Sequence, residues 1–202
     1  VWISEIMLQQ TQVATVIPYF NKFILNFPTI KSLASAGEDD VLRLWTGLGY
    51  YSRARNLMKT AQLIQTLHDG EFPTNIDLLI ALPGIGRSTA GAIISLAFEA
   101  KAAILDGNVK RVLARYHGIR GWPGHGKIEK KFWAVAEASL PDKNYRTYSQ
   151  SVMDLGATLC TRAKPECIRC PLRKGCHAFK HDVITDLPGK KPRQTLKRQN
   201  FF

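Results

Sequence analysis

Apolar residues recur at helical spacing along most of this chain. Val109, Val112, Leu113 and Tyr116, for example, fall on one face of a helix. The same spacing, with its caps and breakers, predicts helices over Val1–Val16, Thr29–Ala36, Glu38–Trp45, Ser52–Leu67, Thr74–Ala81, Ser88–Glu99, the segment after Asp106, 127–140 and 144–159. No internal repeat and no convincing pair of strands interrupts this pattern. The sequence therefore predicts an all-α fold.

Residue types mark several helix ends. Pro18 is expected to stop the first helix, because proline has no backbone N–H to donate. Ser52 is the predicted N-cap of its helix, and Thr74 with Asp77 resembles a capping box. The final segment, Leu187–Phe202 (LPGKKPRQTLKRQNFF), has five basic residues, no acidic ones and two prolines. This composition is typical of a linker or tail.

Composition adds a strong positive charge to this picture. The 202 residues are 45% apolar, enough for a sizeable core, and carry a formal net charge of +12. Residues 1–100 hold seven basic and eight acidic side chains, whereas residues 101–202 hold twenty-one and eight. The excess therefore lies in the second half, and an anionic polymer is the first partner to consider.

The cysteines argue against a disulfide-stabilised domain and suggest a metal site. All four lie between Cys160 and Cys176, spaced Cys160-x6-Cys167-x2-Cys170-x5-Cys176. Such clustering is a poor disulfide framework for a chain of this length and favours metal ligation. Four thiolates at this spacing could bind zinc or a 4Fe–4S cluster.

No run approaches the roughly 18 apolar residues of a membrane span, so we expect no membrane association.

A glycine-rich turn, LPGIGR at 82–87, joins two predicted helices. Gly84 and Gly86 permit a close backbone approach, and the next helix begins with free N–H groups and the positive end of its dipole. We expect Leu82, Gly84, Gly86 and Arg87 to hold a phosphate group without reading a base. The alternative is a plain helix–helix connector with glycine caps.

Two acidic residues occupy unusual positions. Glu5 lies among Val1, Trp2 and Leu8 on the first helix, which should raise the pKa of its carboxyl group so that it carries a proton near neutral pH. The alternative is an exposed acid at the rim of a half-buried helix. Asp106 is a predicted N-cap, where N–H donors should lower its pKa and keep it anionic.

Gln9, Gln10 and Tyr50 form a third set of candidates. Amide side chains can bond to base edges, and an aromatic ring can enter a base stack from which a nucleotide has been extruded. For Tyr50 the alternative is a core position beside a glycine turn.

These motifs resemble those of one enzyme superfamily. LPGIGRSTA at 82–90 resembles the helix-hairpin-helix of the endonuclease III superfamily of DNA glycosylases. VWISEIMLQQTQ at 1–12, LWTGLGYY at 44–51 and ILDGNVKRV at 104–112 are similar to adenine DNA glycosylases of the MutY type. The resemblance covers essentially the whole chain.

The resemblance implies base-excision repair by hydrolysis of the N-glycosidic bond of adenine mispaired with 8-oxoguanine or guanine. Glu5 would protonate the base, Asp106 would stabilise the sugar cation, and Glu5 or Asn108 would position water. Ser88 stands where the bifunctional lyases of the superfamily have a lysine nucleophile, which implies a monofunctional enzyme.

Further site residues are carried over by the same resemblance. The adenine pocket would be lined by Leu8, Val13, Ser88 and Gln150. The base opposite the adenine would be contacted by Gln9, Gln10 and Tyr50. The cofactor would be a 4Fe–4S cluster on the four cysteines, and the basic residues around it would reach DNA phosphates.

The resemblance also implies an architecture of two helical lobes with a DNA cleft between them. Residues 1–20 and 101–186 would form the iron–sulfur lobe, residues 21–100 a helical barrel with the hairpin, and residues 187–202 a linker toward a C-terminal domain absent here. The helix that would precede Val1 in these enzymes is also missing. We expect an intracellular monomer, cytoplasmic and in a bacterium nucleoid-associated, acting on mispaired double-stranded DNA.

Two alternatives remain at this point. The first is a thymine:guanine mismatch glycosylase of the same superfamily. The second is a non-catalytic helix-hairpin-helix DNA-binding module with a structural metal, in which Glu5 and Asp106 would have no catalytic role.

Overall fold

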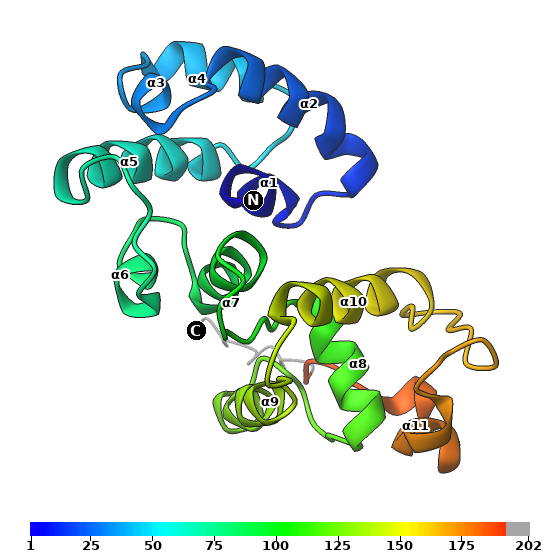
Figure 1. Cartoon of the computed structure of the whole chain (residues 1–202). Helices are drawn as coiled ribbons and strands as arrows, with labels where there is room; N and C mark the ends of the chain where they lie inside the picture. The colour runs from blue at the N-terminus through cyan, green and yellow to red at the C-terminus, as the bar shows by residue number, and fades with distance from the viewer. Residues whose placement is uncertain (193–202) are drawn as a thin grey trace, which may run out of the picture. The chain divides into compact units, whose positions relative to one another are not determined.

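A computed structural model describes residues 1–192 and divides the chain into two compact units (Figure 1). Unit 1 comprises Val1–Ile104 and Pro141–Ser149, and unit 2 comprises Leu105–Leu140 and the residues from Gln150 onward. Every regular element in the described part of the chain is a helix, which confirms the predicted all-α fold.

Unit 1 is built from short helices around one core. Its elements are α1 (Trp2–Leu8), α2 (Val13–Asn26), α3 (Ile30–Ala34), α4 (Glu38–Trp45), α5 (Ser52–Leu67), α6 (Ile76–Ile80), α7 (Arg87–Ala92), the π-helix η1 (Ile93–Ala97) and the first turn of α10 (Tyr145–Thr158). Met7, Phe23, Trp45, Leu57 and Ile64 are all fully buried in this core. Helices α1 and α5, far apart in sequence, therefore share one apolar interior.

Unit 2 is smaller and holds the cysteine-rich segment. Its elements are α8 (Gly107–His117), α9 (Gly126–Ala138), the rest of α10, the 3₁₀ turns η2 (Arg173–Gly175) and η3 (Ile184–Asp186), and α11 (His177–Lys180). Helix α8 packs against both α9 and α11, and Val112, Leu113, Phe132 and Ala178 are buried there. The apolar face that the sequence predicts for 109–116 thus packs inward.

The units divide the chain differently from the predicted lobes. Residues 1–20 lie in unit 1, because Trp2, Ile6 and Met7 of α1 are buried in its core and α1 packs on α5 and α7. The segment 141–149 also belongs to unit 1, where Arg146 donates a hydrogen bond to the carbonyl oxygen of Leu96 (2.8 Å).

The first helix is shorter than predicted. Helix α1 ends at Leu8, Gln10 has a positive φ of 58°, and α2 begins at Val13 and runs through Pro18. Helix α1 therefore ends ten residues before Pro18, the residue that was expected to stop it. Pro18 lies in the second turn of α2, where its missing N–H leaves only one carbonyl group unpaired.

Two predicted caps are displaced by one residue. Asn75 rather than Thr74 caps α6, its side-chain oxygen accepting from the backbone N–H groups of Asp77 (2.8 Å) and Leu78 (3.3 Å). Ser52 is the first residue of α5, whose N-cap is Tyr51. Both helices keep the predicted position, because their apolar faces rather than their caps decide where they pack.

The predicted linker begins as an ordered segment. The Leu187 carbonyl oxygen accepts a hydrogen bond from Arg115 (3.1 Å), and the Gly189 N–H donates to the Gly121 carbonyl oxygen (3.1 Å). Leu187 is buried, Pro188 and Gly189 are half-buried, and residues 190–192 are exposed. Residues 193–202, the rest of the predicted linker, lie outside the described part of the chain.

Candidate functional site

Glu5 lies on α1, which packs against α7. The Glu5 side chain is half-buried, between the buried residues Trp2 and Ile6 of its own helix. Ser88, also half-buried, lies in the first turn of α7. The structure thus places the candidate acid and the candidate pocket serine on neighbouring helices of unit 1, and Glu5 is not a freely exposed surface acid.

Two more predicted pocket residues flank the turn between α1 and α2. Leu8 is half-buried at the end of α1, and Val13 is 62% exposed at the start of α2. Such exposure is unusual for valine, since valine is among the residues most often buried. Gln150 belongs to unit 2, where it is exposed on α10 and donates to the Asp154 carboxylate (2.9 Å).

The glycine-rich turn between α6 and α7 is anchored on its inner side. Leu82 and Ile85 are buried, and the Pro83 carbonyl oxygen accepts from the buried Thr60 hydroxyl (2.9 Å). Gly84 needs its glycine, because its φ is +78° and an added Cβ would lie 3.0 Å from Asn56 Cβ. The anchoring leaves its outer side accessible.

The outer side of this turn is open and basic. Gly84, Gly86 and Arg87 are exposed, and a Cβ on Gly86 would meet nothing within 4 Å. Gly86 is also the N-cap of α7, so the backbone N–H groups that follow have no carbonyl partner within the helix itself. This arrangement is suited to a phosphate group approaching the backbone.

The candidates for contact with the opposite base lie on two turns of unit 1. Gln10 and Tyr50 both have left-handed backbone conformations, with φ of 58° and 49°, and Tyr50 is 58% exposed. Gln9 donates from its side-chain amide to the Gly84 carbonyl oxygen at 3.4 Å. Gln9 therefore joins the first of these turns to the glycine-rich turn, and Tyr50 is not a core residue.

One residue that contacts the candidate site was missed by the sequence analysis. Arg53, on α5, is only 7% exposed and hydrogen-bonds to both turns that carry Gln9, Gln10 and Tyr50. Burial lowers the pKa of Arg53, and the nearby Tyr50 raises it. The available signal was an arginine at the core-facing position of a helix, four residues before the buried Leu57.

Asp106 is the N-cap of α8, as predicted. Its Oδ1 accepts from the backbone N–H of Val109 at 2.7 Å. Burial raises the pKa of Asp106 above its ordinary value of 3.8, although the N–H groups of Val109 and Asn108 and the charge of Arg111 act in the opposite direction. The prediction of a lowered pKa was therefore wrong, because desolvation outweighs the N-cap hydrogen bonds.

Asn108 lies in the first turn of α8, where it faces α10. Its side-chain oxygen accepts from Arg111 (2.8 Å), which also donates to the carbonyl oxygens of Gly156 (2.5 Å) and Cys160 (2.6 Å). A Cβ on Gly156 would lie 2.7 Å from Asn108 Cβ, so only glycine allows this approach. The candidate water-positioning residue is therefore fixed both by hydrogen bonds and by steric contact.

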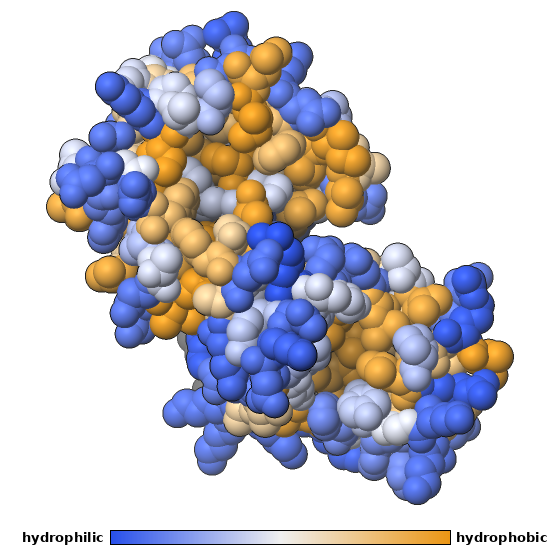
Figure 2. Space-filling view, in the orientation of Figure 1, coloured by the Kyte–Doolittle hydropathy of each residue, from blue (hydrophilic) through white to orange (hydrophobic). Residues whose placement is uncertain are grey.

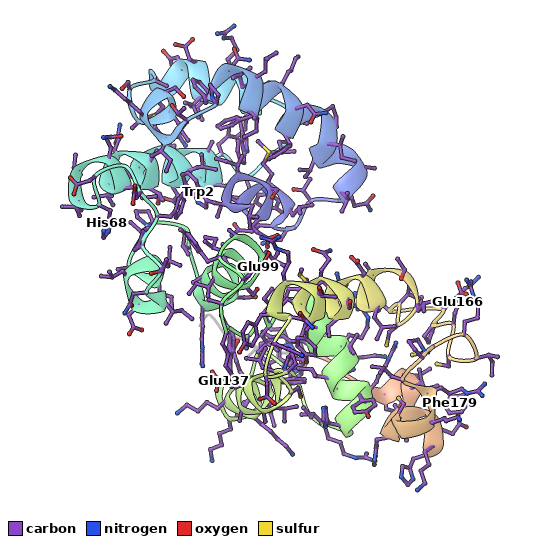
Figure 3. The ribbon with its side chains drawn as sticks, viewed as in Figure 1. Trp2, His68, Glu99, Glu137, Glu166 and Phe179 are labelled. Atoms are coloured by element: carbon purple, nitrogen blue, oxygen red, sulfur yellow. The ribbon has the colours of Figure 1, made fainter. Side chains whose placement is uncertain are left out.

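The four cysteines line one cavity of unit 2 together with Arg115, Arg173, Leu159, Phe179 and Ile184. All four are half-buried free thiols, and Figure 3 labels Phe179, which lines the same cavity. Burial and the neighbouring thiols of Cys160 and Cys176 raise the pKa of Cys167. Such a set suits a positively charged metal centre, which would favour the thiolate forms.

The spread of the thiols bears on which group they could hold. Within residues 1–192, no three His, Cys, Asp or Glu side chains are arranged to hold a metal ion. The four cysteines line one cavity, so their thiolates could together hold a metal group placed within it.

Positive charge surrounds this cavity. Arg115 is 4% exposed and donates to Cys160 Sγ (3.4 Å) and to the carbonyl oxygen of Thr161 (2.7 Å). Four exposed basic side chains lie on the same segment: Arg162, Lys164, Arg169 and Lys174. Figure 2 shows blue, hydrophilic surface in this part of unit 2. A surface of this kind can bind phosphates.

Among residues 1–192, no helix is both long and apolar enough to cross a membrane.

The chain is similar to several known proteins. An adenine DNA glycosylase of Buchnera aphidicola subsp. Acyrthosiphon pisum (strain APS) is 53% identical over 98% of this chain and 57% of that protein. An adenine DNA glycosylase of Mus musculus is 41% identical over 94% of this chain and 38% of that protein. The chain therefore spans little more than half the length of the bacterial relative.

Solved structures share the fold. A thermostable thymine-DNA glycosylase is 28% identical with a TM-score of 0.79, over 89% of this chain and 83% of that one. Endonuclease III in a non-covalent complex with DNA is 24% identical with a TM-score of 0.75, over 90% of this chain and 84% of that one. The second likeness shows the fold alone.

The sequence profile of the HhH-GPD superfamily of base excision DNA repair proteins matches residues 3–138, more than half of the chain. This range includes Glu5, the glycine-rich turn and Asp106, whose local geometry is described above. The chain therefore belongs to the HhH-GPD superfamily of base excision DNA repair proteins.

Proposed function

We propose that this chain is the catalytic part of an adenine DNA glycosylase. Its reaction is the hydrolysis of the N-glycosidic bond of adenine mispaired with 8-oxoguanine or guanine in double-stranded DNA. The observation that carries the proposal is the likeness to proteins named adenine DNA glycosylase, which reaches 53% identity over 98% of this chain.

The residues support an acid-catalysed cleavage. Glu5, half-buried on α1, donates a proton to N7 of the extruded adenine, and the electron pair of the C1′–N9 bond leaves with the base. The sugar becomes an oxocarbenium-like cation. Asp106 stabilises this cation with its carboxylate, whose direction is set by the hydrogen bond from Val109.

Water completes the reaction. A serine in the first turn of α7 cannot form a Schiff base with C1′, so Ser88 supports a monofunctional hydrolase. Asn108, fixed by Arg111 and by its contact with Gly156, orients the water, whose oxygen adds to C1′ as its proton passes to a carboxylate. The resemblance to the adenine DNA glycosylases assigns Leu8, Val13, Ser88 and Gln150 to contact with the adenine.

DNA is held by contacts that do not read its sequence. Leu82, Gly84, Gly86 and Arg87 of the anchored turn bind one phosphate, and the basic residues near the cysteines bind others. Cys160, Cys167, Cys170 and Cys176 hold a 4Fe–4S cluster, which when bound supplies structural cross-links to this loop. Gln9, Gln10 and Tyr50 contact the base opposite the adenine.

The test is base release under single-turnover conditions from three matched duplexes. We expect adenine release from duplexes with adenine opposite 8-oxoguanine and opposite guanine, and no thymine release from a thymine:guanine duplex. The thymine substrate is included because a thymine-DNA glycosylase shares 28% identity and the fold. Release of thymine alone would favour that activity, and binding without any release would favour a non-catalytic DNA-binding module.

A further inference from the structure

One buried guanidinium contacts both turns that carry the candidate readers of the opposite base. Arg53 lies in the first turn of α5, whose inner face is otherwise formed by residues such as Ala54, Leu57 and Ala61. A charged group in such a position is costly unless it is hydrogen-bonded; both Nη atoms of Arg53 have several acceptors, whereas its buried Nε has none among the described residues. The hydrogen-bond acceptors of Arg53 therefore indicate which parts of the structure its buried guanidinium stabilises.

Its Nη1 atom binds the end of α1. Nη1 lies 3.1 Å from the Ile6 carbonyl oxygen, 2.7 Å from that of Met7 and 2.7 Å from that of Gln9. The last carbonyl groups of a helix have no partner within the helix. Arg53 thus donates the hydrogen bonds that a further helical turn would have supplied to these carbonyl groups, so the chain can turn at Gln9 and Gln10.

Its Nη2 atom binds the second turn. Nη2 donates to the carbonyl oxygens of Leu48 (3.3 Å) and Gly49 (3.1 Å), and to the Thr11 hydroxyl (3.1 Å). The guanidinium carbon also lies 5.3 Å from the centre of the Tyr50 ring. A cation at this distance attracts the ring electrostatically, so Arg53 acts on the Tyr50 side chain as well as on its backbone.

Both turns contain strained residues. Gln10 and Tyr50 have φ of 58° and 49°, and a non-glycine residue keeps such a conformation only where its surroundings enforce it. Gln10 and Tyr50 are nevertheless exposed, so the enforcement comes from beneath, where Arg53 lies buried. The Gln9 side chain extends the same connection to the Gly84 carbonyl oxygen.

We propose that Arg53 is a positioning residue for opposite-base recognition. It holds the turn at Gln9 and Gln10 and the turn at Tyr50 in one fixed arrangement, and so sets the discrimination between 8-oxoguanine and guanine opposite adenine. The proposal rests on the proposed function, because it is that function which assigns these three residues to the opposite base.

Lysine cannot replace this arginine. A guanidinium presents its donors in a planar fork that reaches two separate turns, whereas an ammonium group is a compact point charge. Arg53→Lys therefore keeps the charge and loses the bridge between the turns. The matched control is Arg55→Lys on the same helix, since Arg55 is exposed and pairs only at the surface with Glu38 (2.7 Å).

The first measurement is amide hydrogen exchange of the full-length, cluster-loaded protein without DNA. Arg53→Lys should raise exchange in peptides covering 9–12 and 47–51, and Arg55→Lys should leave it unchanged. Circular dichroism checks that both variants are folded. Equal exchange in the two variants would overturn the proposal, whatever the protein does to DNA.

The second measurement is the ratio of single-turnover adenine release rates with 8-oxoguanine and with guanine opposite. Arg53→Lys should reduce this ratio roughly tenfold, the effect of about one charge-assisted hydrogen bond. In a Tyr50→Ala background the same change should have a smaller effect, because the part of the effect that passes through Tyr50 is already lost and only the part that passes through Gln9 and Gln10 remains. Equal slowing of both reactions would mean that Arg53 only supports the fold.

The two measurements separate the two proposals. If the unmodified protein releases no adenine from either duplex, the proposed function fails. The exchange experiment still decides whether Arg53 holds the turns, and unchanged exchange would refute that on its own.

Discussion

Glu5 and Asp106 are both half-buried, and substitutions at each have different expected consequences. Glu5→Gln keeps the size and polarity of the side chain but removes its ability to give a proton. We expect adenine release to fall by about 10²–10⁴-fold, the usual contribution of a general acid. Duplex affinity should stay within about twofold, since one neutralised side chain outside the basic surface adds little to phosphate binding.

Binding titrations run beside single-turnover assays would check this separation. Parallel loss of binding and release would assign Glu5 a structural role on α1 and remove it from the reaction.

Asp106→Asn should separate activity from stability. Burial raises the pKa of Asp106 in the folded chain, so its contribution to the free energy of unfolding is present below the unfolded pKa and is lost as pH rises through the folded pKa. Asparagine has no charge to desolvate and can still accept the Val109 N–H as an N-cap. At neutral pH the variant should unfold at the same or a higher temperature and be slower by about 10²–10³-fold in adenine release.

The same raised pKa predicts the acidic limb of the pH–rate profile. Since only the ionised form stabilises the sugar cation, release should decline at a pH above the ordinary value of 3.8 for an aspartate. An Asp106→Asn variant as active as the unmodified protein at neutral pH, where Asp106 is ionised, would contradict this role.

The proposed function makes Ser88 the residue that determines the type of product. Borohydride should trap almost no covalent enzyme–DNA adduct, because no Schiff base forms on a hydroxyl group. Ser88→Lys supplies an amine at this position and should give a trapped adduct visible on a denaturing gel. Efficient trapping by the unmodified protein would point instead to a lysine nucleophile elsewhere and a lyase activity.

At the scale of helices, α10 approaches α8 closely at Gly156, a residue of α10 that faces Asn108 of α8. Gly156→Ala places a methyl group 2.7 Å from Asn108 Cβ and 2.9 Å from its carbonyl oxygen. The backbone must shift, at a cost of about 1–3 kcal/mol in the free energy of unfolding. Asn108 moves with it, so the rate of adenine release should fall more than duplex affinity.

The matched control is Gly107→Ala on α8, where an added Cβ meets nothing within 4 Å. Thermal unfolding and single-turnover rates of the two variants test the contact directly. Similar behaviour of both would show that the approach of α10 does not position Asn108.

Helix positions were predictable from periodicity, whereas several ends were not. Helix α4 has the predicted bounds Glu38–Trp45, because acidic residues begin it and a glycine turn ends it. Helix α1 ends early because Arg53, more than forty residues away in sequence, takes its last carbonyl groups. No pattern within residues 1–16 contains that information, and so the predicted helix ran too far.

At the scale of the whole chain, each unit has its own core, and the cysteines belong to unit 2 alone. We expect Cys167→Ser to abolish the visible absorption of the purified protein and its bound iron. Duplex affinity should fall by at least tenfold, since the basic loop at 160–176 loses its cross-links.

Unit 1 should remain folded in this variant, because Met7, Trp45 and Leu57 are buried without contribution from the cysteine segment. Hydrogen exchange of α5 provides the readout, with Ser151→Ala on the exposed surface of α10 as the control. Global loss of protection would show that the two units fold as one.

The distribution of charge agrees with this division of the chain. The first hundred residues are nearly neutral and contain the candidate acid and the anchored turn, whereas the second half holds the basic residues around the cysteines. The proposed function therefore assigns base extrusion and protonation to unit 1, and phosphate binding and the stabilising carboxylate largely to unit 2.

The sequence by itself determined the helical class, most helix positions, the cap at Asp106 and the identity of the candidate site residues. These depend on local spacing and on residue types, which the chain carries within a few turns. Tertiary structure alone decided that residues 1–20 pack in unit 1, that burial raises the pKa of Asp106, and that Arg53 binds two distant turns. Desolvation and long-range hydrogen bonds arise only when remote segments meet, so no local pattern could have predicted them.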